Sequence, residues 1–407
     1  MLDVSRLISR AGRSAATGID RVELAYAQHL IAAHNELGFA AVNAVGGIGC
    51  LAGAEVEPYI AALSAAWADG AARRGDQRHI RRLALGLRTR ALLRGGRWLR
   101  AHQQSQFSPP IYLNVSHFRL EARAPIARIK RDAGARFVCL IHDLIPIRFP
   151  EYAKPGQDRR HRRRIETAAA LSDAIIVASS VTRRELEPYL RRAGRSPPIV
   201  VAPFGCRLPA ATPPPQPGAA PYFVCLGTIE GRKNHLLLLQ LWRQLAADLG
   251  TRAPRLILVG QRGNFSQGSI DLLERCPTLR GLVVERNDLP DREMAPLLQG
   301  ARALLLPSFA EGFGFPLIEA LALGVPALCS DLPALRETGG DVPEFIDPLD
   351  SVRWREAILA YAAPASARRD AQLQRLAGWR PPQWEDHFAA IHRLLAEVAG
   401  AASPAGQ

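Results

Sequence analysis

The sequence has 407 residues, of which 48% are hydrophobic and 22% charged, and its formal net charge is +14 at pH 7. This length allows two domains with full cores, and the composition is that of a soluble globular protein. No apolar run approaches the roughly 18–20 residues of a membrane-spanning helix, and the first residues lack the basic-then-apolar plan of a signal peptide.

The cysteine pattern indicates a reducing compartment. Six cysteines are scattered along the chain, and no two of them form a Cys-x-x-Cys pair. Such a pattern is typical of reduced, mostly buried thiols and argues against a zinc site or a disulfide framework. We therefore expect a cytoplasmic protein.

The positive charge comes almost wholly from arginine and is concentrated in two clusters, Arg73–Arg100 and Arg159–Arg164. On charge alone, such clusters suit nucleic acid, anionic lipid headgroups or a phosphorylated acceptor. The first cluster is interleaved with leucine and tryptophan, which favours an amphipathic helix on anionic lipid of the inner membrane face. We therefore expect no nucleic-acid partner, and the alternative is a solvated basic face that binds nothing.

The first half of the chain predicts strands that alternate with helices, a pattern typical of a parallel α/β sheet. Thr182 and Glu185 have the spacing of a capping box for a further helix, which follows the strand at 174–178. The predicted helices cover residues 19–34, 125–132 and 160–171. The predicted strands are residues 2–4, 111–115, 137–141, 174–178 and 199–201.

Two places in this half are candidates for ligand contact. Gly18 precedes a predicted helix and could place backbone amides near a phosphate, although helix capping is the commoner use of such a glycine. His142 and Asp143 directly follow a predicted strand, and ligands of parallel sheets sit at the carboxyl ends of strands. We expect His142 to contact substrate or handle a proton, the alternative being a histidine that is bonded to neighbouring backbone.

A proline-rich stretch at residues 206–221 prevents helix and central strand, so we expect a stiff linker there. It separates an N-terminal domain, residues 1–205 with a basic insert at about 70–105, from a C-terminal domain, residues 222–383. A helix at 384–400 and a disordered tail at 401–407 complete the chain. The C-terminal domain repeats the pattern, with strands predicted at 222–226, 255–259, 281–284, 303–306 and 325–329.

The stretch from Pro307 to Gly324 has the features of an anion-binding turn. It follows a predicted strand, passes through two glycines and enters a helix that we expect to begin at Pro316 and to stop at Gly324. Two carboxylates, Glu311 and Glu319, flank this turn. Because carboxylates repel phosphate but bind hydroxyls, a sugar nucleotide would satisfy both features. The alternative is a plain strand, turn and helix with a solvated glutamate.

Arg232 and Lys233 lie just past another strand end, in a loop flanked by glycines. In a parallel sheet this loop opens into the same crevice as Glu311, so the two cations could hold a diphosphate and stabilise the charge that develops on it. The sequence contains no Asp-x-Asp motif. We therefore expect no metal and no other cofactor, only a nucleotide-sugar co-substrate.

The motifs taken together resemble family 4 glycosyltransferases. Glu311–Glu319 resembles the donor motif of that family, and Gly227–His235 resembles its phosphate-binding loop. The segments at residues 17–22, 112–117 and 142–147 resemble bacterial mannosyl- and rhamnosyltransferases of surface polysaccharide assembly. The resemblance implies an α/β, GT-B fold, in which two Rossmann-like domains with parallel sheets face each other across a cleft.

The resemblance also implies a retaining, metal-independent transfer and a set of residue roles. Glu311 would hold donor-sugar hydroxyls, and Glu319 the ribose hydroxyls. Arg232 and Lys233 would hold the diphosphate. His142 would lie near the reacting centre. The implied catalytic residues are therefore His142, Glu311, Arg232 and Lys233. The other implied contacts are Gly227, Gly312, Phe313, Gly314 and Phe315 with the donor, Asn287 and Leu289 with the base, and Gly18, His142 and Asp143 with the acceptor.

The resembling motifs do not identify the sugar that is transferred. The preferred donor is GDP-mannose, and the expected acceptor is a saccharide or a saccharide linked to a polyprenyl diphosphate. A rhamnosyl- or glucosyltransferase that uses dTDP-rhamnose or a UDP-sugar is the alternative, as is a GT-B protein that binds a nucleotide sugar without catalysis. A Rossmann oxidoreductase is less favoured, because no Gly-x-Gly-x-x-Gly follows a predicted strand.

Overall fold

The computed structural model describes residues 1–13, 15–33, 38–43, 46–69, 74–94, 109–206, 221–287 and 289–400. Residues 207–220 of the predicted linker, the predicted tail at 401–407, and residues 70–73 and 95–105 of the predicted basic insert lie outside this description. The chain divides into two compact units. Unit 1 comprises Met1–Ile147, Asp158–Phe204 and the chain from Trp384 onward, and unit 2 comprises Arg148–Gln157 and Gly205–Gln383.

Unit 1 is built on a seven-stranded sheet with the order β3-β2-β1-β4-β5-β6-β7. Neighbouring strands are parallel except β2 and β3, which pair antiparallel. The sequence did not predict this antiparallel edge. The strands are β1 (Leu2–Asp3), β2 (Phe39–Val42), β3 (Ile48–Leu51), β4 (Ile111–Asn114), β5 (Arg136–Ile141), β6 (Ala174–Val177) and β7 (Ile199–Val201).

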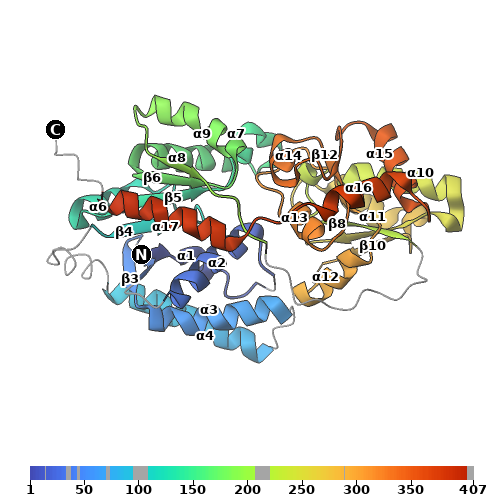
Figure 1. Cartoon of the computed structure of the whole chain (residues 1–407). Coiled ribbons are helices and arrows are strands. Elements are labelled where there is room, and N and C mark those ends of the chain that lie inside the picture. The colour runs from blue at the N-terminus through green and yellow to red at the C-terminus, as the bar shows by residue number, and fades with distance from the viewer. Residues whose placement is uncertain are drawn as a thin grey trace. The chain divides into compact units, whose positions relative to one another are not determined.

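Helices cover both faces of this sheet, which is why its central strands are continuous apolar runs. Side chains of α6, α8 and α9 form one core with β5 and β6. The helices α1, α2 and α17 lie on the other face (Figure 1). The helices are α1 (Ser5–Ser9), α2 (Gly18–Ala32), α3 (Gly53–Asp69), α4 (Arg74–Arg94), α6 (Arg123–Ala133), α7 (Ile145–Arg148), α8 (Gln157–Leu171), α9 (Ser180–Arg192) and α17 (Trp384–Gly400).

The capping box predicted for α9 is wrong. The hydroxyl of Ser179 caps this helix by accepting a hydrogen bond of 3.2 Å from the backbone N–H of Thr182. Ser179 precedes the first helical residue and has an extended backbone, the geometry of an N-cap. Thr182 therefore lies inside the helix, where its backbone N–H donates to the cap and its side chain is not the capping group.

Unit 2 is built on a six-stranded sheet, parallel throughout, with the order β10-β9-β8-β11-β12-β13. Its strands are β8 (Tyr222–Leu226), β9 (Arg255–Val259), β10 (Val283–Arg286), β11 (Leu304–Leu306), β12 (Ala327–Ser330) and β13 (Glu344–Ile346). One core lies under α10 and α15, and a second lies under α12, α13, α14 and α16. The helices are α10 (His235–Leu249), α11 (Gln267–Arg275), α12 (Asp291–Gln299), α13 (Phe315–Ala322), α14 (Pro333–Gly339), α15 (Ser351–Ala362) and α16 (Ala367–Ala377).

The C-terminal helix α17 is anchored in unit 1 by a buried histidine. The Nδ1 of His387 faces the carbonyl oxygens of Ala202 and Pro203 at 3.0 and 3.1 Å, so it carries the proton. Its Nε2 therefore accepts a hydrogen bond of 2.8 Å from the hydroxyl of Tyr26. Burial lowers the pKa of His387 to about 4 from the usual 6.5, against the smaller raising effect of the two carbonyls.

This histidine predicts an acid-sensitive unit 1. Because its pKa is lowered in the folded state, its contribution to stability is complete above pH 6.5 and is lost as the pH falls toward 4. The loss amounts to about 3 kcal/mol if the unfolded pKa is the usual one. Thermal melts of wild type, His387→Gln and the exposed control His392→Gln check this. Between pH 6.5 and pH 4, the fall of the melting temperature with pH should be less steep in His387→Gln than in the wild type and in His392→Gln. An equal dependence on pH in all three proteins contradicts the assignment to His387.

Candidate functional site

The loops that carry the predicted donor residues meet where the strand order of unit 2 reverses. The sheet runs outward from β8 to β9 and β10 in one direction, and from β11 to β12 and β13 in the other. Ligands of open parallel sheets bind outside the carboxyl ends of strands at such a reversal. The loop after β8 holds Arg232 and Lys233, and the loop after β11 holds Glu311.

The two loops are joined by ion pairs to one carboxylate. The Nζ of Lys233 lies 2.6 Å from Oε1 of Glu311, and Nη1 of Arg232 lies 3.2 Å from Oε2. The hydroxyl of Ser308 also donates to Oε1, at 2.6 Å. The Glu311 side chain is only 6% exposed. Burial by itself would raise the pKa of Glu311, but Lys233 and Arg232 outweigh it and lower the pKa to about 2.

The two cations differ in how firmly they are held. Arg232 donates from Nη1 to the carbonyl of Ala310 at 2.6 Å, and from Nη2 and Nε to Oε1 of Glu230 at 2.7 and 3.1 Å. It is therefore fixed between two carboxylates. The ammonium of Lys233 has three donors, one of which goes to Glu311, so Lys233 is the cation with more capacity for a phosphate.

Gly227 gives Lys233 its path across the loop. A Cβ on Gly227 would lie 3.3 Å from Cε of Lys233, and the φ of +133° at this glycine is one that other residues rarely adopt. The absence of a side chain at residue 227 therefore lets the lysine lie over the strand end and reach Glu311.

The segment after Glu311 forms the predicted turn and helix, with the helix beginning at Phe315, one residue earlier than predicted. Gly314, with φ +93°, is its N-cap, and a Cβ there would lie 2.6 Å from Cδ2 of Leu335. Phe313 is buried, and its carbonyl accepts a hydrogen bond from Thr338. Of the other predicted donor-binding residues in this segment, Gly312, Phe315 and Glu319 are half-buried.

The predicted base-binding residues follow β10. Asn287 is exposed, and its side-chain amide faces the carbonyl of Gly260 and Oε1 of Glu285, each at 2.9 Å. Since both of these are acceptors, the amide is assigned the orientation in which its nitrogen donates to them. Leu289 is half-buried and packs against the second core of unit 2. Asp288 between them lies outside the described residues.

The predicted acceptor-side residues lie in unit 1. His142 is 7% exposed, and its Nε2 donates to the carbonyl of Val115 at 2.8 Å, which leaves Nδ1 without the proton. Burial lowers the pKa of His142 to about 4, so it is neutral at pH 7. Asp143 accepts from the amide of Ile145, and Gly18 is the exposed first residue of α2, which is capped by Thr17.

His117, for which no role was predicted, supports His142. Its Nε2 accepts a hydrogen bond of 3.1 Å from the backbone N–H of His142. His117 has φ +60°, a costly conformation for a non-glycine residue, and Oδ1 of Asn114 holds it by accepting from its backbone N–H at 3.2 Å. No local sequence signal predicts this contact, because it joins the ends of two strands.

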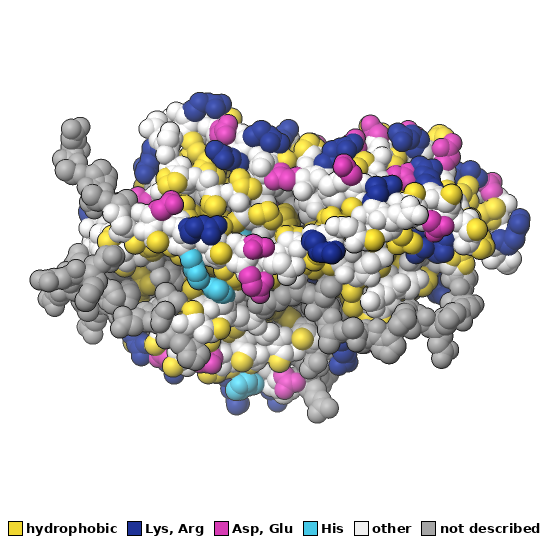
Figure 2. Space-filling model, in the orientation of Figure 1, with side chains coloured by type: hydrophobic (Ala, Val, Ile, Leu, Met, Phe, Trp, Pro, Cys, Tyr) yellow, Lys and Arg dark blue, Asp and Glu magenta, His cyan; other side chains and the backbone are white. Residues whose placement is uncertain are grey.

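The arginine clusters lie on helix surfaces of unit 1. On α4, Leu85, Leu92 and Leu93 are 64%, 45% and 73% exposed among exposed arginines. On α8, Arg164 pairs with Glu121 at 2.8 Å, whereas Arg159 and Arg163 are exposed. On the face drawn in Figure 2, basic side chains are scattered among acidic and hydrophobic ones. Within the described residues, no helix combines the length and apolarity needed to cross a bilayer.

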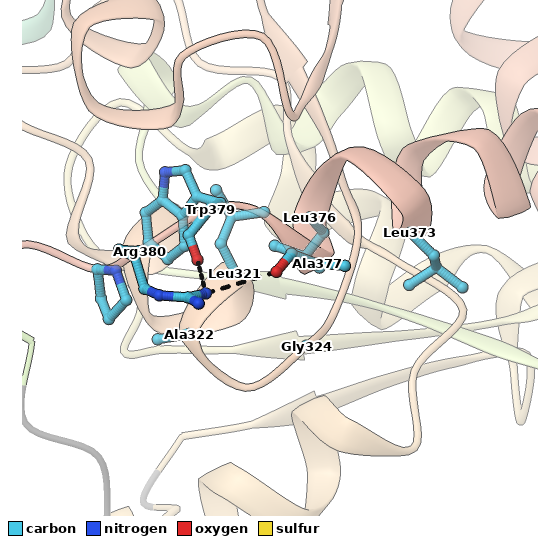
Figure 3. Close-up of a pocket in the computed structure, with 9 residues that line it drawn as sticks. Leu321, Ala322, Gly324, Leu373, Leu376, Ala377, Trp379 and Arg380 are labelled. Carbon is cyan, nitrogen blue, oxygen red and sulfur yellow. Dashed lines mark hydrogen bonds between the residues drawn. The ribbon is translucent and has the colours of Figure 1, made fainter.

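A surface hollow of about 360 Å³ lies elsewhere in unit 2, at the end of α13 and beside α16 (Figure 3). Its lining includes Leu321, Gly324 and Trp379, and Arg380 donates to the carbonyls of Ala377 and Trp379. None of the predicted site residues lines it. Over the described parts of the chain, no cluster of three or more His, Cys, Asp or Glu side chains is placed to hold a metal ion.

The part of the chain that matches a known protein family contains this site. Residues 220–363 match the family described as "Glycosyl transferases group 1". The chain is 31% identical over 261 residues to the O-antigen chain mannosyltransferase B of Escherichia coli, with 62% of this chain and 68% of that protein covered. The chain belongs to the group 1 glycosyltransferases. This membership sets aside the oxidoreductase alternative.

Further relatives are consistent with membership of this family. The serotype-specific mannosyltransferase WbdA of Escherichia coli is 27% identical over 224 residues, which cover 51% of this chain and only 27% of WbdA. Among solved structures, the sucrose-phosphate synthase of Thermosynechococcus elongatus is 20% identical, with a TM-score of 0.55 over 75% of this chain and 77% of that one. The fold is GT-B, with two Rossmann-like domains.

Chemical labelling tests the path of Lys233. The chain has three lysines, Lys130, Lys154 and Lys233, so acetylation by acetic anhydride can be followed at each by mass spectrometry. In Gly227→Ala, Lys233 should be displaced from Glu311 and acetylated several-fold faster relative to exposed Lys154. The control Gly281→Ala has φ +74° but no neighbour within 4 Å of its added Cβ. It should leave the ratio unchanged, and an unchanged ratio in Gly227→Ala contradicts the packing argument.

Proposed function

We propose that this glycosyltransferase moves a hexose from a nucleotide sugar, with mannose from GDP-mannose as the first candidate, to a saccharide or lipid-linked saccharide. The observation that carries the proposal is the convergence of Lys233 and Arg232 on buried Glu311 at the strand-order reversal of unit 2. The relatives that are mannosyltransferases of the O-antigen chain support mannose. A rhamnosyl- or glucosyltransferase is the second candidate.

The charges of the site fit the two halves of a nucleotide sugar. Lys233 would neutralise the diphosphate, and Arg232 would hold the loop and share that role once a phosphate competes with Glu230. Glu311, ionised at any working pH, would accept hydrogen bonds from sugar hydroxyls. Glu319 would do so for ribose, and Gly312 to Phe315 would bring backbone amides and the start of α13 toward the anion.

The proposed reaction retains the configuration of the sugar. The bond between the anomeric carbon and the diphosphate oxygen breaks, and the acceptor oxygen bonds to the same face of that carbon. The acceptor proton passes to the departing phosphate, so no protein nucleophile is required. The charge that builds up on the leaving diphosphate would be stabilised by Lys233, Arg232 and the helix start, which leaves no step that needs a metal ion.

We further propose that the protein works in the cytoplasm and that α4 holds it on an anionic lipid surface. The exposed leucines Leu85, Leu92 and Leu93, which lie among arginines, support this assignment, since apolar and basic side chains together favour a membrane interface.

Substitutions at the paired residues test the catalytic assignment. Lys233→Ala and Glu311→Gln should each lower kcat/KM by about 100-fold or more, because each removes a charged group aimed at the donor. Transfer is measured across a panel of nucleotide sugars, with and without EDTA, and folding is checked by circular dichroism. Wild-type activity should be the same with EDTA.

The matched control is Arg355→Ala, which breaks an exposed ion pair of 2.7 Å with Asp248 in the same unit. It should leave transfer unchanged. Full activity in both Lys233→Ala and Glu311→Gln would rule out this site, and dependence on an added metal would rule out the metal-free mechanism.

A further inference from the structure

The sheet of unit 1 has its own reversal of strand order, between β1 and β4. The same rule that places a ligand at the reversal of unit 2 applies to this crevice. Arg6 and Arg10 follow β1, and Ser116 and His117 follow β4. The donor site of the proposed reaction uses neither arginine.

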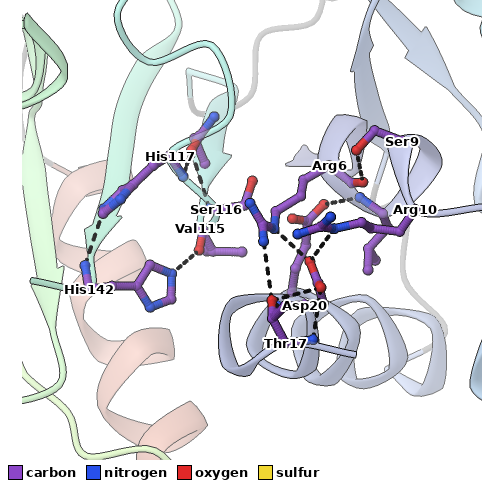
Figure 4. Close-up of polar contacts among 12 residues, drawn as sticks. Arg6, Ser9, Arg10, Thr17, Asp20, Val115, Ser116, His117 and His142 are labelled. Atoms are coloured by element: carbon purple, nitrogen blue, oxygen red, sulfur yellow. Dashed lines mark hydrogen bonds and ion pairs between the residues drawn. The ribbon is translucent and has the colours of Figure 1, made fainter. Parts of the chain in front are cut away.

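Both arginines converge on one buried carboxylate (Figure 4). The Nε of Arg6 lies 2.6 Å from Oδ1 of Asp20, and the Nε of Arg10 lies 3.0 Å from the same oxygen. The other oxygen of Asp20 accepts from the backbone N–H and the hydroxyl of Thr17, at 2.9 and 2.7 Å. Asp20 is fully buried, so its carboxylate is a fixed anchor that holds two guanidinium groups together.

This cluster carries an excess of positive charge. Two guanidinium groups face one anchoring carboxylate, and the arginine side chains are 18% and 21% exposed. In the described part of the chain, the terminal nitrogens of Arg10 make no hydrogen bond, and those of Arg6 make one, to Thr17. Behind them burial raises the pKa of Glu23 to about 8, so Glu23 is mostly neutral at pH 7.

Polar atoms without partners border the same cluster. The hydroxyl of Ser116 and Oε2 of Glu23 are buried, and neither makes a hydrogen bond of good geometry within the described residues, although Ser116 lies close enough to the Glu23 carboxyl to lower its pKa. Arg6 lies near both Glu23 and His142, because its charge opposes the rise in the pKa of Glu23 and adds to the fall in the pKa of His142. The cluster therefore adjoins the predicted acceptor-side histidine, and its arginines, together with the neighbouring hydroxyl of Ser116, suit a ligand that combines an anion with hydroxyls.

We propose that Arg6 and Arg10 form a phosphate site of unit 1 that binds the phosphate of the acceptor. The assignment to the acceptor rests on the proposed function, in which the donor diphosphate has its own cations, Lys233 and Arg232, in unit 2. An acceptor linked to a lipid through a diphosphate supplies the matching anion and sugar hydroxyls. Arg10, whose terminal nitrogens make no hydrogen bond to any described residue, is the phosphate ligand. Arg6 adds its positive charge to the site and is held beside Arg10 by the same carboxylate.

Calorimetric titration with inorganic pyrophosphate tests the site. It is done in the full chain carrying Lys233→Ala, so that the lysine of the donor loop does not contribute. Adding Arg10→Gln should weaken pyrophosphate binding about tenfold, the effect of losing one charge-assisted contact. Arg10→Lys should recover part of the loss. The control Arg13→Gln removes the same charge three residues away, from an exposed side chain, and should leave binding unchanged.

Three results would overturn the proposal. These are unchanged binding in Arg10→Gln, equal weakening in Arg13→Gln, and no binding of pyrophosphate at all. Titration of Arg10→Gln alone with GDP separates donor from acceptor, since GDP affinity should stay within about twofold of wild type. A parallel loss would assign the pair to the donor instead. If the wild-type chain transfers no sugar from any donor of the panel while the Lys233→Ala chain still binds pyrophosphate through Arg10, the proposed function is refuted and the anion site stands.

Discussion

The two loops of unit 2 that we propose bind the donor depend on one buried carboxylate. Glu311 draws the side chains of Lys233 and Arg232 from the loop after β8 to the loop after β11, and it is held in turn by Ser308. A buried charge is tolerated only when it is paired, and removing one partner leaves the other uncompensated. The pairing therefore fixes the position of the cations before any ligand arrives, and such preorganisation is what the proposed stabilisation of a leaving diphosphate requires.

The same physical plan occurs in both units. In each, the strand order reverses next to the first strand, and a buried acid in a loop or a first helical turn gathers two cations. In unit 2 the acid is Glu311, and in unit 1 it is Asp20. The two centres differ in the hydrogen-bond donors that their arginines have to spare. Arg232 also pairs with a second carboxylate, whereas the terminal nitrogens of Arg10 make no hydrogen bond to any described residue. A two-substrate enzyme can use two such centres.

Much of the fold could be predicted because the central strands are unbroken apolar runs, such as β8, whose bounds agree with the prediction. The sequence did not reveal β2, β3 and β13. The edge strands β3 and β13 contain a glycine and a glutamate, and the run of β2 includes two alanines, which favour strands weakly. Glu311 and Lys233 were found because glycine-flanked loops after strands are a local signal. The anchoring of Arg10 by Asp20 was not, because ten residues of loop and helix must fold before the two meet.

Titration of the Glu311 carboxylate tests the central claim most directly. The resonance is assigned by carbon-13 NMR of glutamate-labelled protein as the one that disappears in Glu311→Gln. With a pKa near 2, held down by Lys233 and Arg232, it should remain ionised throughout a titration from pH 7 to pH 4. A midpoint at pH 4 or above would show that the two cations do not hold this carboxylate, and the account of the donor site would fail.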